Sequence, residues 1–185
     1  DCFRVEKSRV LKYKGKREDL VKPIHLDAVT DYLITRHKAI EVRGIEADDQ
    51  CVIDCYGTDN VLVGIDKDYF GCPVLYANTM RGDIVDCDQF GKLELNAKGD
   101  VKGYGRMFLY FQLASGDSID NYKANSASDI RWGDKSAYDA LKDCKTDAEA
   151  WLAVVAIYQR LYPEPKSIEG WRGDIIEIDW YSMLQ

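Results

Sequence analysis

Carboxylates in three short groups are the side chains of this 185-residue chain best suited to chemistry. Like charges repel, so gathering these groups at one place without cations would force several of them to take up protons. Hard divalent ions such as Mg²⁺ or Mn²⁺ bind through carboxylate oxygens and would neutralise them. The candidate metal ligands are Glu46, Asp48 and Asp49 in EADD, Asp66 and Asp68 in IDKD, and Asp117 and Asp120 in GDSIDN.

Each acidic group also has a simpler structural interpretation. EADD opens an expected helix, where carboxylates favour the positive end of the helix dipole. IDKD fits a polar turn in which aspartates bond the local backbone. Taken together, the three groups favour metal binding over these separate explanations.

A basic segment with an aromatic residue precedes the acidic groups. YKGKR places Lys14, Lys16 and Arg17 beside Tyr13. Lys and Arg side chains clamp phosphates, and an aromatic ring stacks on a base. The segment is a candidate nucleic-acid contact, with an ordinary solvated basic surface as the alternative.

The elements that must position these residues alternate between helix and strand in the first half of the chain. The apolar spacing predicts one helix from Pro23 to about His37 and another over residues 46–57, ended by Gly57. Residues 39–43 alternate like a short strand. The apolar run 61–65 is typical of a parallel strand buried on both faces, and it places Asp66 at the carboxyl end of that strand, where ligands usually bind. Further short strands are expected within residues 74–79, 83–88 and 92–100.

The second half of the chain has helical patterns. Helices are expected over residues 107–115, 134–144, 146–162 and 174–184, with Thr146 and Glu149 forming a capping box. The expected organisation is an α/β core at residues 1–116 followed by a helical part at residues 117–185.

Composition excludes several classes of protein. The chain has a net charge of −7, 46% hydrophobic residues and no apolar run long enough to span a membrane. Its six cysteines form no CxxC pair, which favours a cytoplasmic location. Two histidines are too few for His-rich zinc sites, and HExxH is absent. The net acidity does not exclude a nucleic-acid partner, because bound cations would reduce it.

The order and spacing of the motifs resemble those of the 5′ nuclease (flap endonuclease) superfamily. The resemblance covers roughly residues 1–145 and is strongest to phage-encoded 5′–3′ exonucleases of the short podovirus type. The motifs that carry it are FR at 3–4, YKGKR at 13–17, RGIEADD at 43–49, VLVGIDKD at 61–68 and SGDSIDN at 115–121.

The resemblance implies a PIN-like 5′ nuclease fold, with a mainly parallel central sheet flanked by helices. It also implies that the seven carboxylates bind two Mg²⁺ or Mn²⁺ ions and that Lys14 and Arg17 approach the scissile phosphate. Residues 130–141 are similar to the helix-three-turn-helix of the family, which grips duplex DNA and often binds K⁺. They match it at Gly133, Lys135, Ala137 and Leu141, whereas Arg131 stands where the family usually has its first glycine.

Members of this family open with an apolar strand that ends in a metal-binding aspartate, and no such strand precedes Asp1 in the sequence given. Three explanations are open: the chain is a fragment, a processed product, or one half of a split enzyme whose strand comes from a separate N-terminal polypeptide. Without it, the apolar run 61–65 should have an unpaired edge or an exposed face, and the chain alone should be poorly active.

The expected function is Mg²⁺-dependent hydrolysis of phosphodiesters near 5′ ends or flaps of DNA, including RNA primers, during phage DNA replication in the host cytoplasm. Two alternatives remain open. One is a phosphatase of the haloacid-dehalogenase type, which an apolar strand ending in DKD and a later GDSIDN loosely resemble. The other is a nuclease-like subunit that binds DNA or a partner without catalysis.

Overall fold

The computed structural model describes residues 2–8, 11–17, 20–126 and 128–162. The expected helix at 174–184 lies outside these residues. The α-helices are α1 (Phe3–Lys7), α2 (Leu26–His37), α3 (Ala47–Cys55), α4 (Arg106–Ser115), α5 (Asp134–Leu141) and α6 (Asp147–Leu161). The 3-10 helices are η1 (Gly15–Arg17) and η2 (Asp68–Gly71), and the strands are β1 (Val61–Gly64), β2 (Leu75–Asn78), β3 (Ile84–Asp86), β4 (Lys92–Leu95), β5 (Val101–Tyr104), β6 (Gly116–Asp117) and β7 (Tyr122–Lys123).

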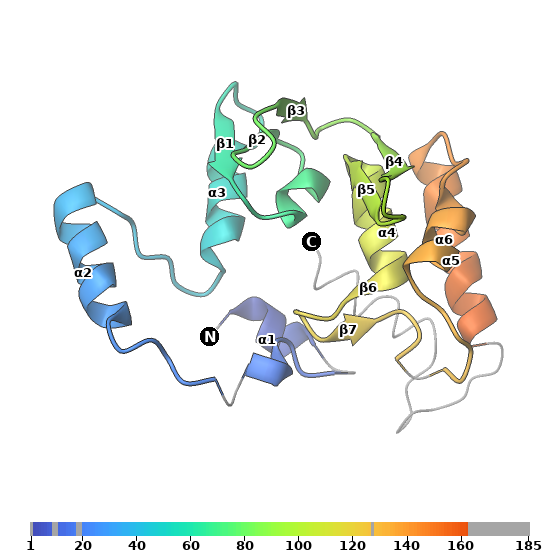
Figure 1. Cartoon of the computed structure of the whole chain (residues 1–185), viewed down its shortest axis with the longest axis horizontal. Helices are drawn as coiled ribbons and strands as arrows, with labels where there is room; N and C mark the ends of the chain where they lie inside the picture. Colours follow the sequence, from blue (N-terminus) through green and yellow to red (C-terminus); the bar gives the residue numbers. More distant parts are fainter. Residues whose placement is uncertain (1, 9–10, 18–19, 127, 163–185) are drawn as a thin grey trace.

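The strands form small sheets, and the helices lie around them (Figure 1). Strand β1 is parallel to β2, and β2 is antiparallel to β3. Strands β4 and β5 form one antiparallel hairpin, and β6 and β7 form another. The fold is therefore α/β, as expected, but its three-stranded sheet is mixed and small rather than mainly parallel. The expected boundary between Gly116 and Asp117 falls inside β6, and the division into two parts stays a prediction.

Strand β1 is covered on one face only. Leu62 is buried at 5% exposure, whereas Val63 is 64% exposed and Ile65 is 71% exposed. In the described part of the chain β1 is also an edge strand, since β2 is the one strand paired with it there. The prediction that residues 61–65 are buried on both faces is therefore wrong. The predicted strand at 39–43 is also wrong, because these residues form no ladder and have no strand beside them.

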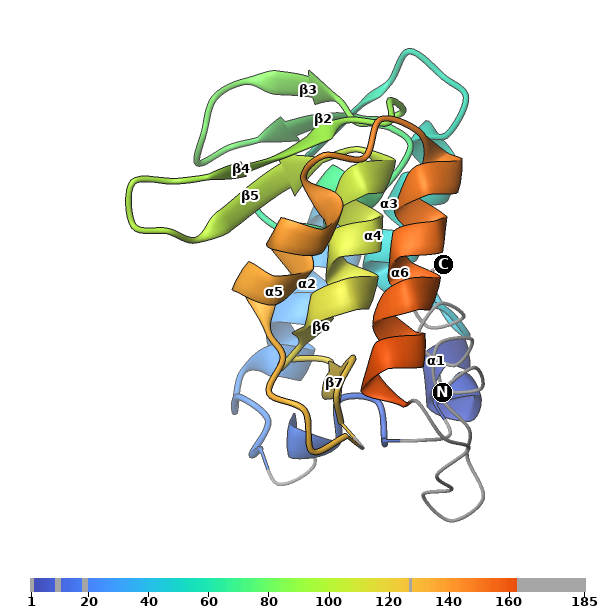
Figure 2. The same ribbon diagram turned by 90° about the vertical axis from the view of Figure 1, so that its right-hand side faces the viewer.

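Helix α4 forms the centre of the core, as its apolar sequence MFLYFQLAS predicts. A helix that is apolar on all sides must be surrounded by other elements. Figure 2 shows α4 between α5 and α6, with the β4–β5 hairpin lying across its beginning. Leu113 and Ala114 of α4 are fully buried, together with Leu141 of α5 and Val154 of α6. This packing holds the end of α4 and the β6–β7 hairpin that follows it.

Glycine is required where α4 begins. Gly105 precedes the helix with a φ of +73°, a conformation that residues with a Cβ rarely adopt. A Cβ at this position would lie 2.3 Å from the carbonyl oxygen of Gln89. Gly105 therefore permits the sharp turn from strand β5, which ends at Tyr104, into α4.

The helices α5 and α6 confirm the helical pattern of residues 134–162. The Thr146 hydroxyl accepts a hydrogen bond from the backbone N–H of Glu149 and caps α6. The Glu149 carboxylate accepts from the backbone N–H of Lys145, one residue before the position expected in a capping box. The N-terminus of α6 is thus capped as predicted, with a shift of one residue in the reciprocal bond.

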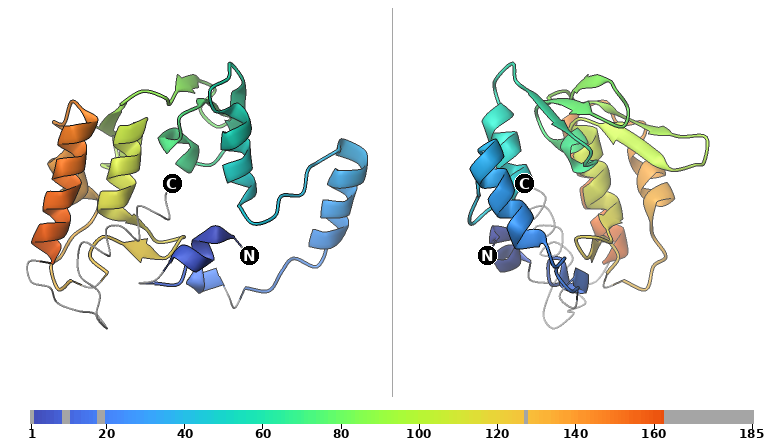
Figure 3. Two further views of the ribbon diagram at one scale, coloured as in Figure 1. Left: turned by 180° about the vertical axis from the view of Figure 1, so that it is seen from behind. Right: turned by 60° about the vertical axis from the view of Figure 1, so that its left-hand side comes forward.

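Helix α2 is separated from the other helices (Figures 1 and 3). It confirms the helix predicted between Pro23 and His37, but each of its residues is exposed within the described chain. An isolated helix of this length is marginal in water, because most helical stability comes from packing. The described part of the chain provides no such packing for α2.

Candidate active site

The three acidic groups meet at one cavity of about 160 Å³. The groups come from the start of α3, from the end of β1 with η2, and from the β6–β7 turn. Its wall contains six of the predicted carboxylates and three residues of the basic segment, namely Glu46, Asp48, Asp66, Asp68, Asp117, Asp120, Tyr13, Lys14 and Arg17, together with Lys67 and Ile119. We call this space the carboxylate cavity. Asp49 lines a smaller adjoining cavity of about 90 Å³ with Arg4.

Glu46 is held by the basic segment. Lys14 Nζ lies 2.5 Å from Glu46 Oε1, and the Tyr13 hydroxyl donates to Glu46 Oε2 at 2.6 Å. Burial disfavours the ionised carboxylate, but these hydrogen bonds outweigh it and hold the pKa of Glu46 below its ordinary value. The Tyr13 ring is buried at 6% exposure, so its observed role is to orient Glu46 rather than to present a face to solvent.

Asp49 forms an ion pair with Arg4, a residue that was not among the predicted site residues. Two guanidinium nitrogens of Arg4 donate to the two oxygens of Asp49, each at 2.6 Å. Burial opposes ionisation of Asp49, but this bidentate pair keeps its pKa below the ordinary value. Asp49 Oδ2 also accepts from the backbone N–H of Glu46 at 2.9 Å. Asp49 therefore supports the start of α3, as its structural interpretation predicts, and lies beside the cavity rather than in its wall.

Lys67 and Gln112 also contact the acidic groups. Lys67 Nζ lies 2.5 Å from Asp117 Oδ2 and 3.2 Å from Asp68 Oδ1. Burial opposes ionisation of Asp117, but Lys67 and the backbone N–H of Ile119 lower its pKa below the ordinary value. Gln112 of α4 donates to Asp68 Oδ1 at 2.6 Å. A glutamine within the apolar sequence of α4 was a signal that could have indicated this contact, and Lys67 stands within IDKD itself.

Three carboxylates of the cavity have no ion pair among the described residues: Asp48, Asp66 and Asp120. Burial, and then the neighbouring Glu46 and Asp49, raise the pKa of Asp48. Burial and the charges of Asp117, Asp68 and Glu46 raise the pKa of Asp120 to about 6, although Lys14 opposes this shift. The cavity thus carries more negative charge than its own cations neutralise.

This charge and the oxygen donors suit a hard divalent cation. In the described chain, however, no three carboxylate, histidine or cysteine side chains stand at the spacing of a preformed metal site. The ammonium of Lys67 lies between Asp68 and Asp117, where a cation would otherwise bind. A metal ion bound to both Asp68 and Asp117 would therefore have to displace Lys67.

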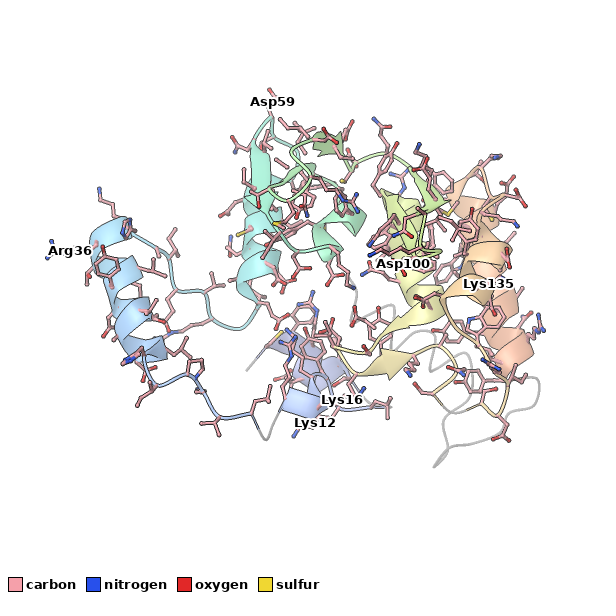
Figure 4. The ribbon with its side chains drawn as sticks, viewed as in Figure 1. Lys12, Lys16, Arg36, Asp59, Asp100 and Lys135 are labelled. Atoms are coloured by element: carbon pink, nitrogen blue, oxygen red, sulfur yellow. The ribbon has the colours of Figure 1, made fainter. Side chains whose placement is uncertain are left out.

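The remaining predicted residues lie around the cavity. Lys16 donates to the carbonyl oxygen of Ser118 at 3.3 Å and lies at the lower edge of the molecule in Figure 4. Gly133 precedes α5 and lines a separate cavity that adjoins the carboxylate cavity. Lys135 lies on α5 and is exposed (Figure 4). The structure therefore gathers Tyr13, Lys14 and Arg17 at the carboxylates and leaves Lys16, Gly133 and Lys135 at its periphery.

Comparison with protein-family models, with curated proteins and with solved structures found no significant match. Within the described residues, no helix has the length and apolar character needed to cross a membrane.

Proposed function

We propose that this chain is the catalytic part of a Mg²⁺-dependent nuclease with a PIN-like 5′ nuclease fold, acting on phosphodiesters near 5′ ends or flaps of DNA, including RNA primers. The observation that supports this most is the meeting of carboxylates from three distant segments with Lys14 and Arg17 at one cavity. The proposed fold has a mainly parallel sheet, whereas the three-stranded sheet of this chain is mixed, so the sheet gives the proposal the least support.

The residues that would hold Mg²⁺ or Mn²⁺ are the six carboxylates of the cavity wall, with Asp49 supporting them from the adjoining cavity. Bound divalent ions would lower the pKa of a water nucleophile and stabilise the charge that develops on the phosphate. The lack of an ion pair at Asp48, Asp66 and Asp120 within the described residues favours this binding.

The cations of the cavity have separate roles in the proposal. Arg17 lines the cavity without an ion pair in the described chain and is available to a phosphate oxygen. Lys14 bonds Glu46 and would be shared between that carboxylate and the substrate. Tyr13 keeps Glu46 oriented. Positioning and charge stabilisation of this kind typically contribute orders of magnitude to phosphoryl-transfer rates.

A 5′-flap duplex with a labelled flap tests the proposal directly. The unmodified chain should cleave it slowly but measurably in Mg²⁺ and not in EDTA, when the protein is in excess over the duplex. Asp66→Ala and Asp117→Ala should each reduce that rate by at least about 100-fold. Asp59→Ala is the matched control, because Asp59 is exposed and lies outside both cavities. If both site variants cleaved as fast as the unmodified chain, the proposed site would be wrong.

A DNA-binding subunit without catalysis is the second candidate function. The ion pairs of Arg4, Lys14 and Lys67 favour it, because they neutralise part of the carboxylate cluster without any metal. Tight flap binding without cleavage in Mg²⁺ or Mn²⁺ would support this function. No comparable observation favours a haloacid-dehalogenase-type phosphatase, since Glu46 and Asp48 share the cavity with Asp66 and have no role in that chemistry.

A further inference from the structure

A second, larger cavity adjoins the carboxylate cavity. It has a volume of about 360 Å³ and shares Lys67, Asp117 and Ile119 with the carboxylate cavity. Its wall continues from the end of α4 along the β6–β7 hairpin, which lies below α4 in Figure 2, to the start of α5. A polymer leaving the carboxylate cavity past Lys67 would enter this space. We call it the Trp132 cavity.

The aromatic wall of this cavity is Trp132, whose ring is held in place before any ligand arrives. Its Nε1 donates to the carbonyl oxygen of Ala114 at 2.8 Å. The guanidinium carbon of Arg160 lies 5.7 Å from the ring centroid. An aromatic ring that is already ordered loses little conformational entropy when a planar group stacks on it. Trp132 therefore has the properties of a stacking platform.

The cavity also contains a cation that the protein does not use. Lys123 is exposed and lines the Trp132 cavity, and its ammonium group has no hydrogen bond or ion pair within the described part of the chain. Ser115 and Ser118 line the same wall, which also contains Asp117 and Asp134. An indole, a free ammonium group and hydroxyls in one space match the base, phosphate and sugar of a nucleotide.

We propose that the Trp132 cavity binds one nucleotide of the substrate strand next to the hydrolysed bond, with its base stacked on Trp132 and its phosphate held by Lys123. The volume lies within the roughly 300–1,000 Å³ of small-ligand sites and is larger than the carboxylate cavity. This inference rests on the proposed function, which identifies the polymer as a nucleic-acid strand.

A double-mutant cycle on binding tests the stacking contact. The probe is a fluorescein-labelled 5′-flap duplex, measured by anisotropy in Ca²⁺, with either a normal nucleotide or an abasic residue at each position flanking the flap junction. Trp132→Leu should weaken binding of the normal duplex by about tenfold. At one position, the abasic residue should weaken binding to the unmodified protein by a similar factor and cause no further loss in Trp132→Leu.

Two other variants make the result specific. Trp132→Phe should restore most of the affinity, because it keeps an aromatic face. Trp151→Leu is the matched control, since Trp151 of α6 packs beside Tyr110 and lines neither the Trp132 cavity nor the carboxylate cavity. Additive losses in Trp132→Leu and the abasic duplex would overturn the inference.

A second measurement covers the case in which Trp132→Leu fails to fold. A flap duplex with 2-aminopurine at the sensitive position should lose fluorescence when it binds the unmodified protein, because stacking quenches this base. Absence of quenching at every position flanking the junction would overturn the inference. Binding and quenching without cleavage would overturn the proposed nuclease activity and support nucleotide binding in the Trp132 cavity. Cleavage without quenching would support the nuclease activity and overturn nucleotide binding in the Trp132 cavity. Failure to bind flap DNA at all would overturn both.

Discussion

Replacing Asp120 with asparagine should stabilise the metal-free protein while weakening its response to Mg²⁺. Burial and the charges of Asp117, Asp68 and Glu46 raise the pKa of Asp120 from 3.8 to about 6. A shift of that size corresponds to at most about 3 kcal/mol of lost stability when the carboxylate is ionised. Because the side chain is partly accessible to water, we halve this to about 1.5 kcal/mol.

The sign of the pH dependence follows from the same shift. The folded state binds the Asp120 proton more tightly than the unfolded state, so stability falls as the pH rises from about 4 to about 6 and stays lower above that range. The advantage of Asp120→Asn should therefore be near zero at pH 4 and fully present at pH 8. For a chain of this size it corresponds to an increase of roughly 3 to 6 °C in Tm.

Thermal denaturation at pH 4 and pH 8, in EDTA and in Mg²⁺, measures both effects. Mg²⁺ should raise the Tm of the unmodified protein at pH 8 and raise that of Asp120→Asn much less, because a carboxylate ligand is lost. Asp59→Asn is the control, since Asp59 lies at the tip of the α3–β1 loop, far from the cavity (Figure 4). A lower Tm for Asp120→Asn than for the unmodified protein at pH 8 in EDTA would show that the Asp120 charge is already compensated, and would refute the reasoning.

Three further changes have defined outcomes. Tyr13→Phe should keep the fold and reduce flap cleavage about tenfold, because Glu46 loses one hydrogen bond; an unchanged rate would remove Tyr13 from the site. Leu113→Ala should lower the free energy of unfolding by about 3 kcal/mol, measured by urea denaturation, because Leu113 is fully buried in α4. Leu152→Ala is the control and should lower it much less, because Leu152 is exposed on α6. A peptide with an apolar strand that ends in aspartate should pair with the open edge of β1 and raise cleavage; an equal effect from a scrambled peptide would contradict this.

Local sequence signals predicted most of the elements around the site. The helices α3 to α6 follow from apolar spacing and from the Thr146 cap, which act within a few residues. The strand expected within 92–100 is instead β4 followed by a turn, and its partner β5 (Val101–Tyr104) was not predicted. The errors concern the strands. In residues 39–43 apolar and polar side chains alternate as in a strand, but no strand lies beside them. Strand β1 is apolar, but only one of its faces is covered. Both errors arise because a strand is stabilised by partners that its own sequence does not specify.

For the candidate site, too, some properties follow from the sequence and others only from the fold. The sequence by itself determined which residues could carry its charge: the three acidic groups and the basic segment stand in short motifs whose chemistry follows from residue type. Only the tertiary structure decided how that charge is balanced. It pairs Arg4 with Asp49 and Lys67 with Asp117, and it brings Gln112 from the centre of α4 to Asp68, across separations of 45, 50 and 44 residues. Charges interact strongly over only a few ångströms. The packing of α3, β1, α4 and the β6–β7 hairpin, rather than the motifs, therefore leaves Asp48, Asp66 and Asp120 without an ion pair among the described residues.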